Sequence, residues 1–586
     1  MPTQPTIHYQ VSLPNPRSHY YHVAARFEGP LPDVLTIALP VWTPGSYLVR
    51  EYARHVVQMT AESGGQALTV DPRSKSEWQI AVPRGATEVT VHYEAFAYEL
   101  TVRTSYLDDE YGLITGTSLF VYHEPWKTHP VSLELILPPG WDAATALDPH
   151  DAAVHRYVAP DYDTLVDSPI QMGRLHRYSF VVDNIPHSVV VAGHGAETLP
   201  RSSFLQDLAQ IVAASRDIFG ELPYTHYDFL VTLTEQSGGG LEHLNSANIM
   251  VSRKQWRDPK DYSSVLSLFA HEFFHLWNVK RLRPTMLGPF NYQSEVYTSL
   301  LWALEGITDY FAQWLLANSQ VLPVNEVLTT WARSLQRLER QPGREWTSLA
   351  AASREAWIRQ YRPDANTTNI TISYYLKGAL VGLYLDLELR RATEGRSGLS
   401  TIMRDLWDRY GDRGYPESTF ERRIAEVGGT HLKDLMSRYV HGTDPFDDTI
   451  FETVGLRLDR AFSEEEGHRL AWLGLDAVER NGRVYARSVE RGGPAEQGGV
   501  SPDDEIVALQ HERIATVEQW HRALAPIAPE QTVTLHTFHH GVLESRHITA
   551  VLPRPDDYRL LPVADPTLAQ RTAFEHWLGV AFPKDS

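Results

Sequence analysis

The chain has 586 residues, which is too long for a single hydrophobic core and indicates three or four domains. Its composition is ordinary for a globular protein, with 42% hydrophobic and 22% charged residues, and no run approaches the 18 or so apolar residues of a membrane span. The formal net charge of −20 argues against binding to a phosphate backbone. We therefore expect no nucleic acid partner and no membrane span.

The first residues and the cysteine content predict the compartment. The segment MPTQPTIHYQVSLPNP lacks the basic start and the apolar stretch of a secretory signal, and the chain contains no cysteine. We expect a cytoplasmic protein.

Residues 1–190 show short alternating apolar patterns separated by Pro, Gly and Asp clusters. Examples are YHVAARFEG, VLTIALPVW and HRYSFVVDNIPHSVVVAG. Alternation with a period of two is typical of half-buried strands, so this region is predicted to be an all-β, sandwich-like domain.

Apolar residues then recur at helical spacing through residues 191–446, as in SSVLSLFAHEFFHLWNVKRL and YLKGALVGLYLDLELRR. A β segment is inserted where YDFLVTLTE and ANIMVS flank a glycine run. Strand-like pieces return in residues 447–555, with one helical stretch at VEQWHRALAPI, and residues 556–586 form a tail in which QRTAFEHWLG predicts a docking helix. The predicted fold class is multidomain α+β.

The segment SLFAHEFFHLWNVKRL places His271, Glu272 and His275 in one apolar helix. Histidines four residues apart lie on the same face, about 6 Å from each other, so both rings can reach one zinc ion at about 2.1 Å. Glu272 is then placed to activate a water molecule on the metal as the general base. An HExxH string also occurs by chance in chains of this size, so its helical context is what strengthens the prediction.

A zinc site of this kind needs a third protein ligand. Glu305 lies on the next predicted helix, LLWALEGITDYFAQ, and is the best candidate. Asp309, one turn further on, could accept the second ring N–H of His271 and fix its tautomer. The alternative for Asp309 is an ordinary exposed helix acid. The expected cofactor is one Zn²⁺ per chain, although cobalt or manganese also suit a His₂Glu site.

The segment TEQSGGGLEHLNSANIM lies upstream between two predicted strands. Its glycines, including Gly239 and Gly240, would let a backbone edge approach an extended peptide and pair with it. The carboxylate of Glu242 could hold the α-ammonium group of a substrate and restrict cleavage to the first residue. A glycine-rich hairpin with an incidental acid explains the same pattern equally well.

Tyr374 and Tyr375 stand just ahead of the helix in SYYLKGALVGLYLDLELR. A phenol aimed at the developing oxyanion would stabilise the tetrahedral intermediate. The residues alone favour a core position for both tyrosines.

Taken together, these motifs resemble the glycyl aminopeptidase family of thermolysin-like gluzincins, which is distantly related to the alanyl and leukotriene-hydrolase aminopeptidases. The resemblance runs through VWTPGSYLVREYARHV, GGGLEHLNS, HEFFHLWNVKRLRP, WALEGITDY and YYLKG. It implies an N-terminal β domain, a mainly helical thermolysin-like catalytic domain and a C-terminal PDZ-like domain. It also implies release of N-terminal residues from peptides with a free N-terminus, with glycine and alanine favoured.

Carried over residue by residue, the resemblance implies zinc ligands at His271, His275 and Glu305 and a base at Glu272. The amine-binding acid of the related aminopeptidases corresponds to Glu242, although GLEH departs from their Gly, hydrophobic, Glu, Asn string. Their Tyr, any, Lys, Gly string selects Tyr375 as the oxyanion tyrosine.

The C-terminal region resembles a PDZ domain through RGGPAEQGGVSPDDEIVAL. The segment AWLGL at residues 471–475 could be its carboxylate-binding loop, because backbone N–H groups there can capture a peptide C-terminus. Two further functions stay open: an endopeptidase of the same fold in which Glu242 is structural, and a PDZ-based peptide-binding adaptor with a relic peptidase domain.

Overall fold

The computed structural model describes residues 5–151, 154–462 and 471–583. Residues 1–4 of the first predicted domain and residues 584–586 of the predicted tail lie outside the described residues. Two compact units are formed. The first consists of Met1–Thr298, Phe311–Val321 and Met403–Thr419, and the second of Ser299–Tyr310, Leu322–Ile402 and Phe420–Ser586.

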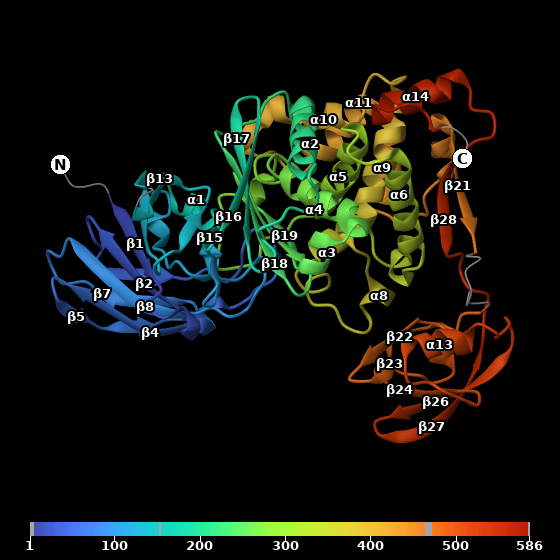
Figure 1. The fold of residues 1–586 in the computed structure, drawn as a ribbon, viewed down its shortest axis with the longest axis horizontal. Coiled ribbons are helices and arrows are strands. Elements are labelled where there is room, and N and C mark those ends of the chain that lie inside the picture. Colours follow the sequence, from blue (N-terminus) through green and yellow to red (C-terminus); the bar gives the residue numbers. More distant parts are fainter. Residues whose placement is uncertain (1–4, 152–153, 463–470, 584–586) are drawn as a thin grey trace. The chain divides into compact units, whose positions relative to one another are not determined.

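The N-terminal part of the first unit is built on an eight-stranded sheet (Figure 1). Its order is β13 (Asp148–Asp151), β14 (Arg156–Ala159), β11 (Val131–Ile136), β1 (Thr6–Ser12), β2 (Tyr20–Glu28), β8 (Glu88–Phe96), β4 (Val56–Ser63) and β5 (Gln66–Leu68). Two smaller sheets accompany it, β3 (Val34–Ala38), β7 (Glu77–Ala81) and β6 (Val70–Pro72), and β12 (Asp142–Ala144), β15 (Ile170–Gly173), β10 (Tyr111–Ile114) and β9 (Tyr106–Leu107).

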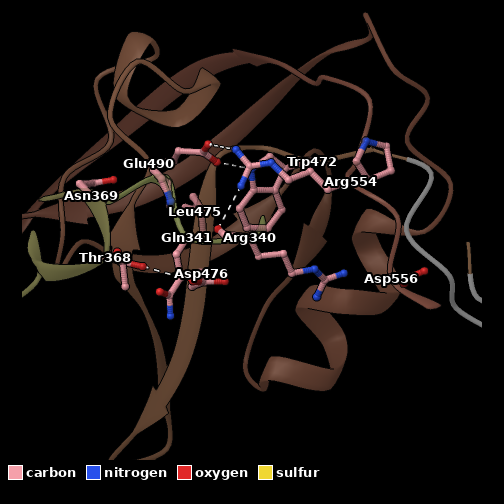
Figure 2. A pocket seen from close by; sticks show the side chains of 13 residues that line it. Arg340, Gln341, Thr368, Asn369, Trp472, Leu475, Asp476, Glu490, Arg554 and Asp556 are labelled. Atoms are coloured by element: carbon pink, nitrogen blue, oxygen red, sulfur yellow. Dashed lines mark hydrogen bonds and ion pairs between the residues drawn. The ribbon is translucent and has the colours of Figure 1, made fainter. Parts of the chain in front are cut away.

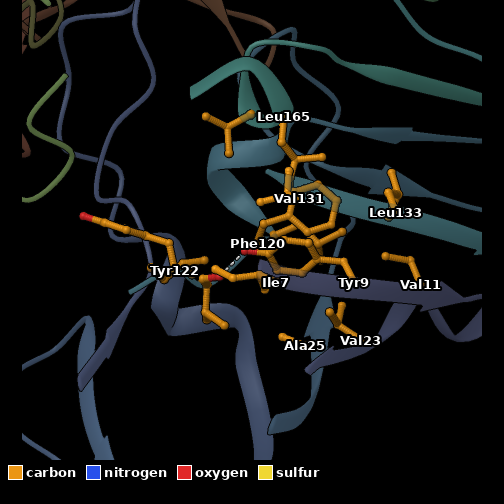
Figure 3. Packing of buried hydrophobic residues seen from close by; sticks show 14 of the residues in the cluster. Ile7, Tyr9, Val11, Val23, Ala25, Phe120, Tyr122, Val131, Leu133 and Leu165 are labelled. Atoms are coloured by element: carbon orange, nitrogen blue, oxygen red, sulfur yellow. Dashed lines mark hydrogen bonds between the residues drawn. The ribbon is translucent and has the colours of Figure 1, made fainter. Parts of the chain in front are cut away.

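One face of the large sheet is apolar because alternate residues of its strands point the same way. Ile7, Tyr9 and Val11 of β1 are buried and lie with Phe120 and Leu133 in the core shown in Figure 3. The buried Tyr9 hydroxyl has a hydrogen-bond partner, since it donates to the carbonyl of Val121 at 2.7 Å. The alternation that predicted strands in this region therefore marks its core.

A five-stranded sheet carries the substrate-side motifs in the same unit. Its order is β16 (His176–Val182), β17 (Ile185–Ala192), β18 (Tyr227–Thr234), β20 (Ser246–Ser252) and β19 (Gly239–Glu242). β17, β18 and β20 are parallel, and the antiparallel strands β16 and β19 form the two edges. The hairpin β16–β17, which the sequence pattern grouped with the N-terminal β region, pairs with β18 here, and the boundary predicted at residue 190 falls inside β17.

Helix α4 (Tyr262–Phe274) packs against β19 and β20 and against α2 (Phe204–Phe219). The packing is aromatic: the Phe269 ring lies 5.2 Å from those of both Phe204 and Phe229, and the Phe273 ring lies 5.0 Å from that of Tyr227. Such pairs add to the burial energy of the rings. They fix the helix that carries the HExxH motif next to the glycine-rich edge strand.

The second unit contains a helical part. Its elements include a π-helix at Trp302–Gly306, the start of α5 (Ile307–Asn318), α6 (Val324–Glu339), α7 (Leu349–Arg354), α8 (Thr367–Ile370), α9 (Tyr374–Ala392) and most of α11 (Thr419–Tyr439). Gly306 and Gly378 face each other, and a Cβ on Gly306 would overlap the backbone of Gly378. Two glycines therefore let the π-helix and α9 approach more closely than side chains would allow.

The C-terminal part of the second unit contains a six-stranded sheet. Its order is β22 (Leu475–Arg480), β23 (Arg483–Val489), β24 (Glu505–Leu509), β26 (Thr532–His539) and β27 (Val542–Thr549), with β25 (Glu512–Arg513) paired to β24. Helices α12 (Pro494–Gln497) and α13 (Val517–Leu524) accompany it, and Trp520 of α13 is buried in its core.

The chain ends on β28 (Asp557–Pro562), which pairs with β21 (Leu456–Ala461), and on α14 (Leu568–Leu578). Trp577 of α14 is fully buried, stacks on Trp331 at 5.2 Å and donates to the Tyr310 hydroxyl at 3.1 Å. Among the described residues, no helix is long and apolar enough to cross a membrane.

Candidate active site

His271 lies in the last turn of α4, and His275, one helical turn later, is the C-cap residue that follows the helix. Their Nε2 atoms are 2.9 Å from each other. Nδ1 of His275 lies 2.6 Å from the carbonyl oxygen of Asn278. That contact requires a proton on Nδ1, so in the neutral ring Nε2 of His275 carries a lone pair.

This geometry fits a metal ion. A ring nitrogen that presents a lone pair to a second ring nitrogen at 2.9 Å needs a shared proton or a shared cation. The Asn278 carbonyl fixes the tautomer of His275 in the way that outer hydrogen bonds usually orient zinc histidines. The two histidines are therefore suited to bind one metal through Nε2.

Glu272 faces the edge strand β19. A Cβ on Gly240 would overlap the Glu272 carboxylate, so only glycine lets the strand come this close to the acid. One carboxylate oxygen each from Glu242 and Glu272 and a ring nitrogen of His275 lie within 4.8 Å of one another, and all three residues are buried. The glycine run thus places Glu242 beside the histidine motif.

Glu242 also lines a small cavity of about 20 Å³ in the first unit. The loop between β3 and β4 closes it with Trp42, Gly45 and Tyr47, and residues that follow α4, including Lys280, form another wall. Gly45 adopts a left-handed backbone (φ +86°) and lies against the Glu242 carboxylate. The cavity beside Glu242 has room for a group of about the size of one water molecule.

Asp167 ties the Glu242 strand to the turn after α4. Its carboxylate accepts hydrogen bonds from the Lys280 ammonium at 2.6 Å and the Leu244 backbone N–H at 2.9 Å, and Nδ1 of His243 lies 3.2 Å away. Burial alone would raise the pKa of Asp167, but the Lys280 charge and the His243 bond outweigh it and lower that pKa to about 2. The N–H of Lys280 in turn donates to the His275 carbonyl at 3.0 Å.

In the second unit, Glu305 lies in the π-helix and is buried. π-Helical turns are rare and often occur at functional sites. Tyr375 lies in the first turn of α9, which is capped by the Ser373 side chain. Burial raises the pKa of Tyr375, and the nearby negative charge of Glu305 raises it further. Tyr375 therefore stays a proton donor, and it lies close enough to Glu305 for their charges to interact.

The structure brings the predicted site residues together in two sets, one in each unit. The first unit holds Gly239, Gly240, Glu242, His271, Glu272 and His275, and the second holds Glu305 and Tyr375. Asp309 is half-buried on α5.

Sequence reasoning missed the cavity loop and the Asp167 network. The Pro44–Gly45 pair in VWTPGSY is a turn signal that marks the loop without showing what it contacts. Asp167 carries no local signal, because an isolated acid is common on any surface, and Lys280 lies in the HEFFHLWNVKRLRP segment without a pattern that shows its partner.

Three protein-family descriptions match the chain: Peptidase M61 N-terminal domain over residues 8–174, M61 glycyl aminopeptidase over residues 264–381 and PDZ domain over residues 471–549. The crystal structure of an aminopeptidase N family protein from Idiomarina loihiensis is similar, with 30% sequence identity and a TM-score of 0.91, over 98% of this chain and 100% of that chain. The chain belongs to the M61 glycyl aminopeptidase family.

Membership of the M61 family makes this protein a peptidase. It also confirms the predicted fold class, with an N-terminal β-rich domain, a mainly helical catalytic domain and a C-terminal PDZ domain. More distant likenesses of the M61 protein include an M1 zinc metallopeptidase from Deinococcus radiodurans (14% identity, TM-score 0.48, 76% of this chain and 94% of that chain). Yeast LTA4 hydrolase in complex with bestatin is similar at 13% identity and TM-score 0.46, over 76% of this chain and 69% of that chain. No protein with a curated description matches the chain.

Proposed function

We propose that the protein is a zinc-dependent aminopeptidase that releases the N-terminal residue of a peptide with a free amino group. The observation that carries this proposal is the buried carboxylate of Glu242, which lies beside Glu272 and His275. A buried carboxylate needs a positive partner. The α-ammonium group of a substrate would supply one next to the general base.

His271 and His275 hold the metal through Nε2, and Glu305 is the third ligand, with Asp309 as the hydrogen-bond acceptor that orients His271. The burial of Glu305 supports its assignment, since a buried carboxylate is paired or binds a metal. Zinc is the metal that a His₂Glu donor set most commonly binds in peptidases. Bound zinc would supply the Lewis acidity that makes a water molecule nucleophilic at neutral pH.

Two side chains and one backbone edge of the chain then divide the chemistry. Glu272 accepts the proton of the attacking water and passes it to the leaving amine. Tyr375 donates a hydrogen bond to the carbonyl oxygen of the substrate as negative charge develops on it. The backbone of Gly239 and Gly240 in the edge strand β19 pairs with the extended substrate.

The same site accounts for a preference for glycine and alanine. The cavity beside Glu242 measures about 20 Å³, and its walls include the rings of Trp42 and Tyr47, which are both buried. A cavity of this size can take little more than one small group, so a first residue with a side chain no larger than a methyl group is expected. Larger first residues would require the loop around Gly45 to move.

Substitution of Glu242 by glutamine tests the proposal against an endopeptidase. The variant should raise KM for glycine-leading free-amine peptides by about tenfold to a hundredfold, because one charged hydrogen bond is lost, and change kcat little. N-acetylated peptides should be cleaved by neither protein. Glu235→Gln, at an exposed acid in the preceding loop, is the matched control.

Equal cleavage of free and acetylated peptides by both proteins would show that Glu242 is structural and that the enzyme is an endopeptidase. Cleavage of neither peptide by a zinc-loaded sample would instead favour the peptide-binding adaptor. A parallel assay with a chelator tests the need for the metal. Loss of activity with the chelator and its recovery on addition of zinc would show metal dependence separately from substrate choice.

Capture of a peptide C-terminus by residues 471–475 of the PDZ domain is part of this proposal. The backbone N–H of Trp472 donates to the Val551 carbonyl at 2.8 Å and is already used. Capture of a peptide C-terminus would therefore rest on the backbone N–H groups of the residues that follow Trp472. A cytoplasmic location stays a prediction from the sequence.

A further inference from the structure

A cavity of about 300 Å³ lies in the second unit where the PDZ domain meets the end of α6 and the turn of α8. Its volume is at the lower end of the range for small-molecule sites. The residues that line it are Arg340, Gln341, Pro342, Thr368, Asn369, Trp472, Leu475, Asp476, Ser488, Glu490, Pro553, Arg554 and Asp556 (Figure 2). None of them belongs to α13, so the cavity is not the groove between α13 and β22.

One wall of this cavity is rigid. Arg554 donates to Glu490 at 2.7 Å and to the Arg340 carbonyl at 3.0 Å, and the indole N–H of Trp472 donates to Glu490 at 2.8 Å (Figure 2). Glu490 is therefore neutralised by Arg554. The indole of Trp472 is held in place as an apolar surface.

The floor is fixed by Asn369. Its side-chain amide donates to the Val489 carbonyl at 2.8 Å, and its oxygen accepts from the Arg491 N–H at 3.0 Å. Both bonds join the turn of α8 to the PDZ domain.

The charges that remain in the cavity are of both signs. Among the described residues, the Arg340 guanidinium has no side-chain partner, whereas Arg554 is paired. Asp476 accepts only a 3.3 Å bond from Ser488 and stands 3.7 Å from the exposed Arg487.

We propose that this cavity binds a free α-amino acid, with its carboxylate on Arg340, its ammonium group on Asp476 and an apolar side chain against Trp472. Planar guanidinium groups bind carboxylates in two-pronged hydrogen bonds, which makes Arg340 the anchor. An indole face suits an aromatic side chain.

Isothermal titration of the full chain with L-phenylalanine tests the site. The titration uses the Glu242→Gln protein, in which amino-acid binding at the candidate active site is weakened, and the Arg340 variants below assign the remaining heat to this cavity. One saturable site is expected, with a dissociation constant of roughly 0.1–1 mM. 3-Phenylpropanoate, which lacks the ammonium group, and 2-phenylethylamine, which lacks the carboxylate, should each bind at least about tenfold more weakly.

Arg340→Gln, introduced into the Glu242→Gln protein, should weaken phenylalanine binding at least about tenfold. The affinity of the corresponding Arg340→Lys protein should lie between those of the Glu242→Gln protein and the protein that also carries Arg340→Gln. Arg337→Gln, at an exposed arginine one turn earlier on α6, is the matched control and should leave binding unchanged. Arg340 is exposed, so the melting temperature should not move. Asp476→Asn provides a second variant and should weaken phenylalanine binding but not that of 3-phenylpropanoate.

Absence of saturable heat up to 10 mM phenylalanine, a concentration of roughly ten times the weakest expected dissociation constant, would overturn the proposal. So would equal binding of the three compounds, or binding that survives Arg340→Gln. Each of these results is independent of catalysis. A failure here therefore leaves the proposed peptidase function untouched.

Discussion

The backbone of Gly45 lies directly against the carboxylate of Glu242. A Cβ atom at Gly45 would stand 2.5 Å from Oε1 and 2.7 Å from Oε2 of Glu242, and the φ of +86° is one that side chains rarely adopt. A loop of the N-terminal β-rich region therefore shapes the cavity in which the substrate amine is proposed to bind.

Gly45→Ala should lower kcat/KM for glycine-leading peptides by tenfold or more, because the added methyl group displaces the Glu242 carboxylate. Gly85→Ala is the matched control, since Gly85 has a φ of +81° but no atom within 4 Å of its Cβ position. Both variants should lose about 1 kcal/mol of stability from backbone strain. Unchanged kinetics in Gly45→Ala would show that the contact with Glu242 does not matter for activity.

Tyr375→Phe should reduce kcat by about 10²- to 10³-fold and alter KM little, because the phenol acts only as charge develops on the substrate oxygen. Burial raises the pKa of Tyr375, which favours the protonated phenol as the hydrogen-bond donor. Tyr374→Phe, at the preceding residue, is the control. If the two variants had equal kcat values, Tyr375 would have no special role.

Glu272→Gln should lower kcat by about 10²- to 10⁴-fold, the range that general acid–base catalysis contributes. The metal content of the purified variant should stay at one zinc per chain, because the histidines are untouched. Metal analysis of the same sample distinguishes loss of the base from loss of the metal. A variant that retains full activity would exclude Glu272 as the base.

Asp167→Asn tests the buried network that joins the Glu242 strand to the turn after α4. The pKa of Asp167 is depressed to about 2, so its ionised form stabilises the fold above about pH 4 and that stabilisation is lost as pH falls toward 2. At pH 7 the free energy of unfolding of the variant should fall by at least about 2 kcal/mol, since Lys280 is left buried without its partner. The difference from the unsubstituted protein should shrink below pH 4.

Urea unfolding between pH 3 and 7 measures this difference. Asp109→Asn removes an exposed ion pair with Arg17 and should change stability by less than about 0.5 kcal/mol. A stability loss in Asp167→Asn that is the same at pH 3 and pH 7 would mean that the charge of Asp167 is not its source.

The sequence by itself predicted the elements whose signals are local. His271 and His275 share a face because four residues make about one helical turn, and the surrounding apolar spacing marked the helix. The glycine run predicted a backbone edge, which is strand β19. The string Tyr, any, Lys, Gly selected Tyr375, but only through the resemblance to a family.

Only the tertiary structure decided which distant segments meet. The loop of Gly45 lies against Glu242, Asp167 holds Lys280, and the hairpin β16–β17 pairs with β18 in the sheet next to α4. No sequence periodicity predicts such contacts, because within its own segment each of these side chains could just as well face solvent. They form when burial of the surrounding apolar surface brings the segments together, and the charges then pair because isolated charges are costly in a buried place.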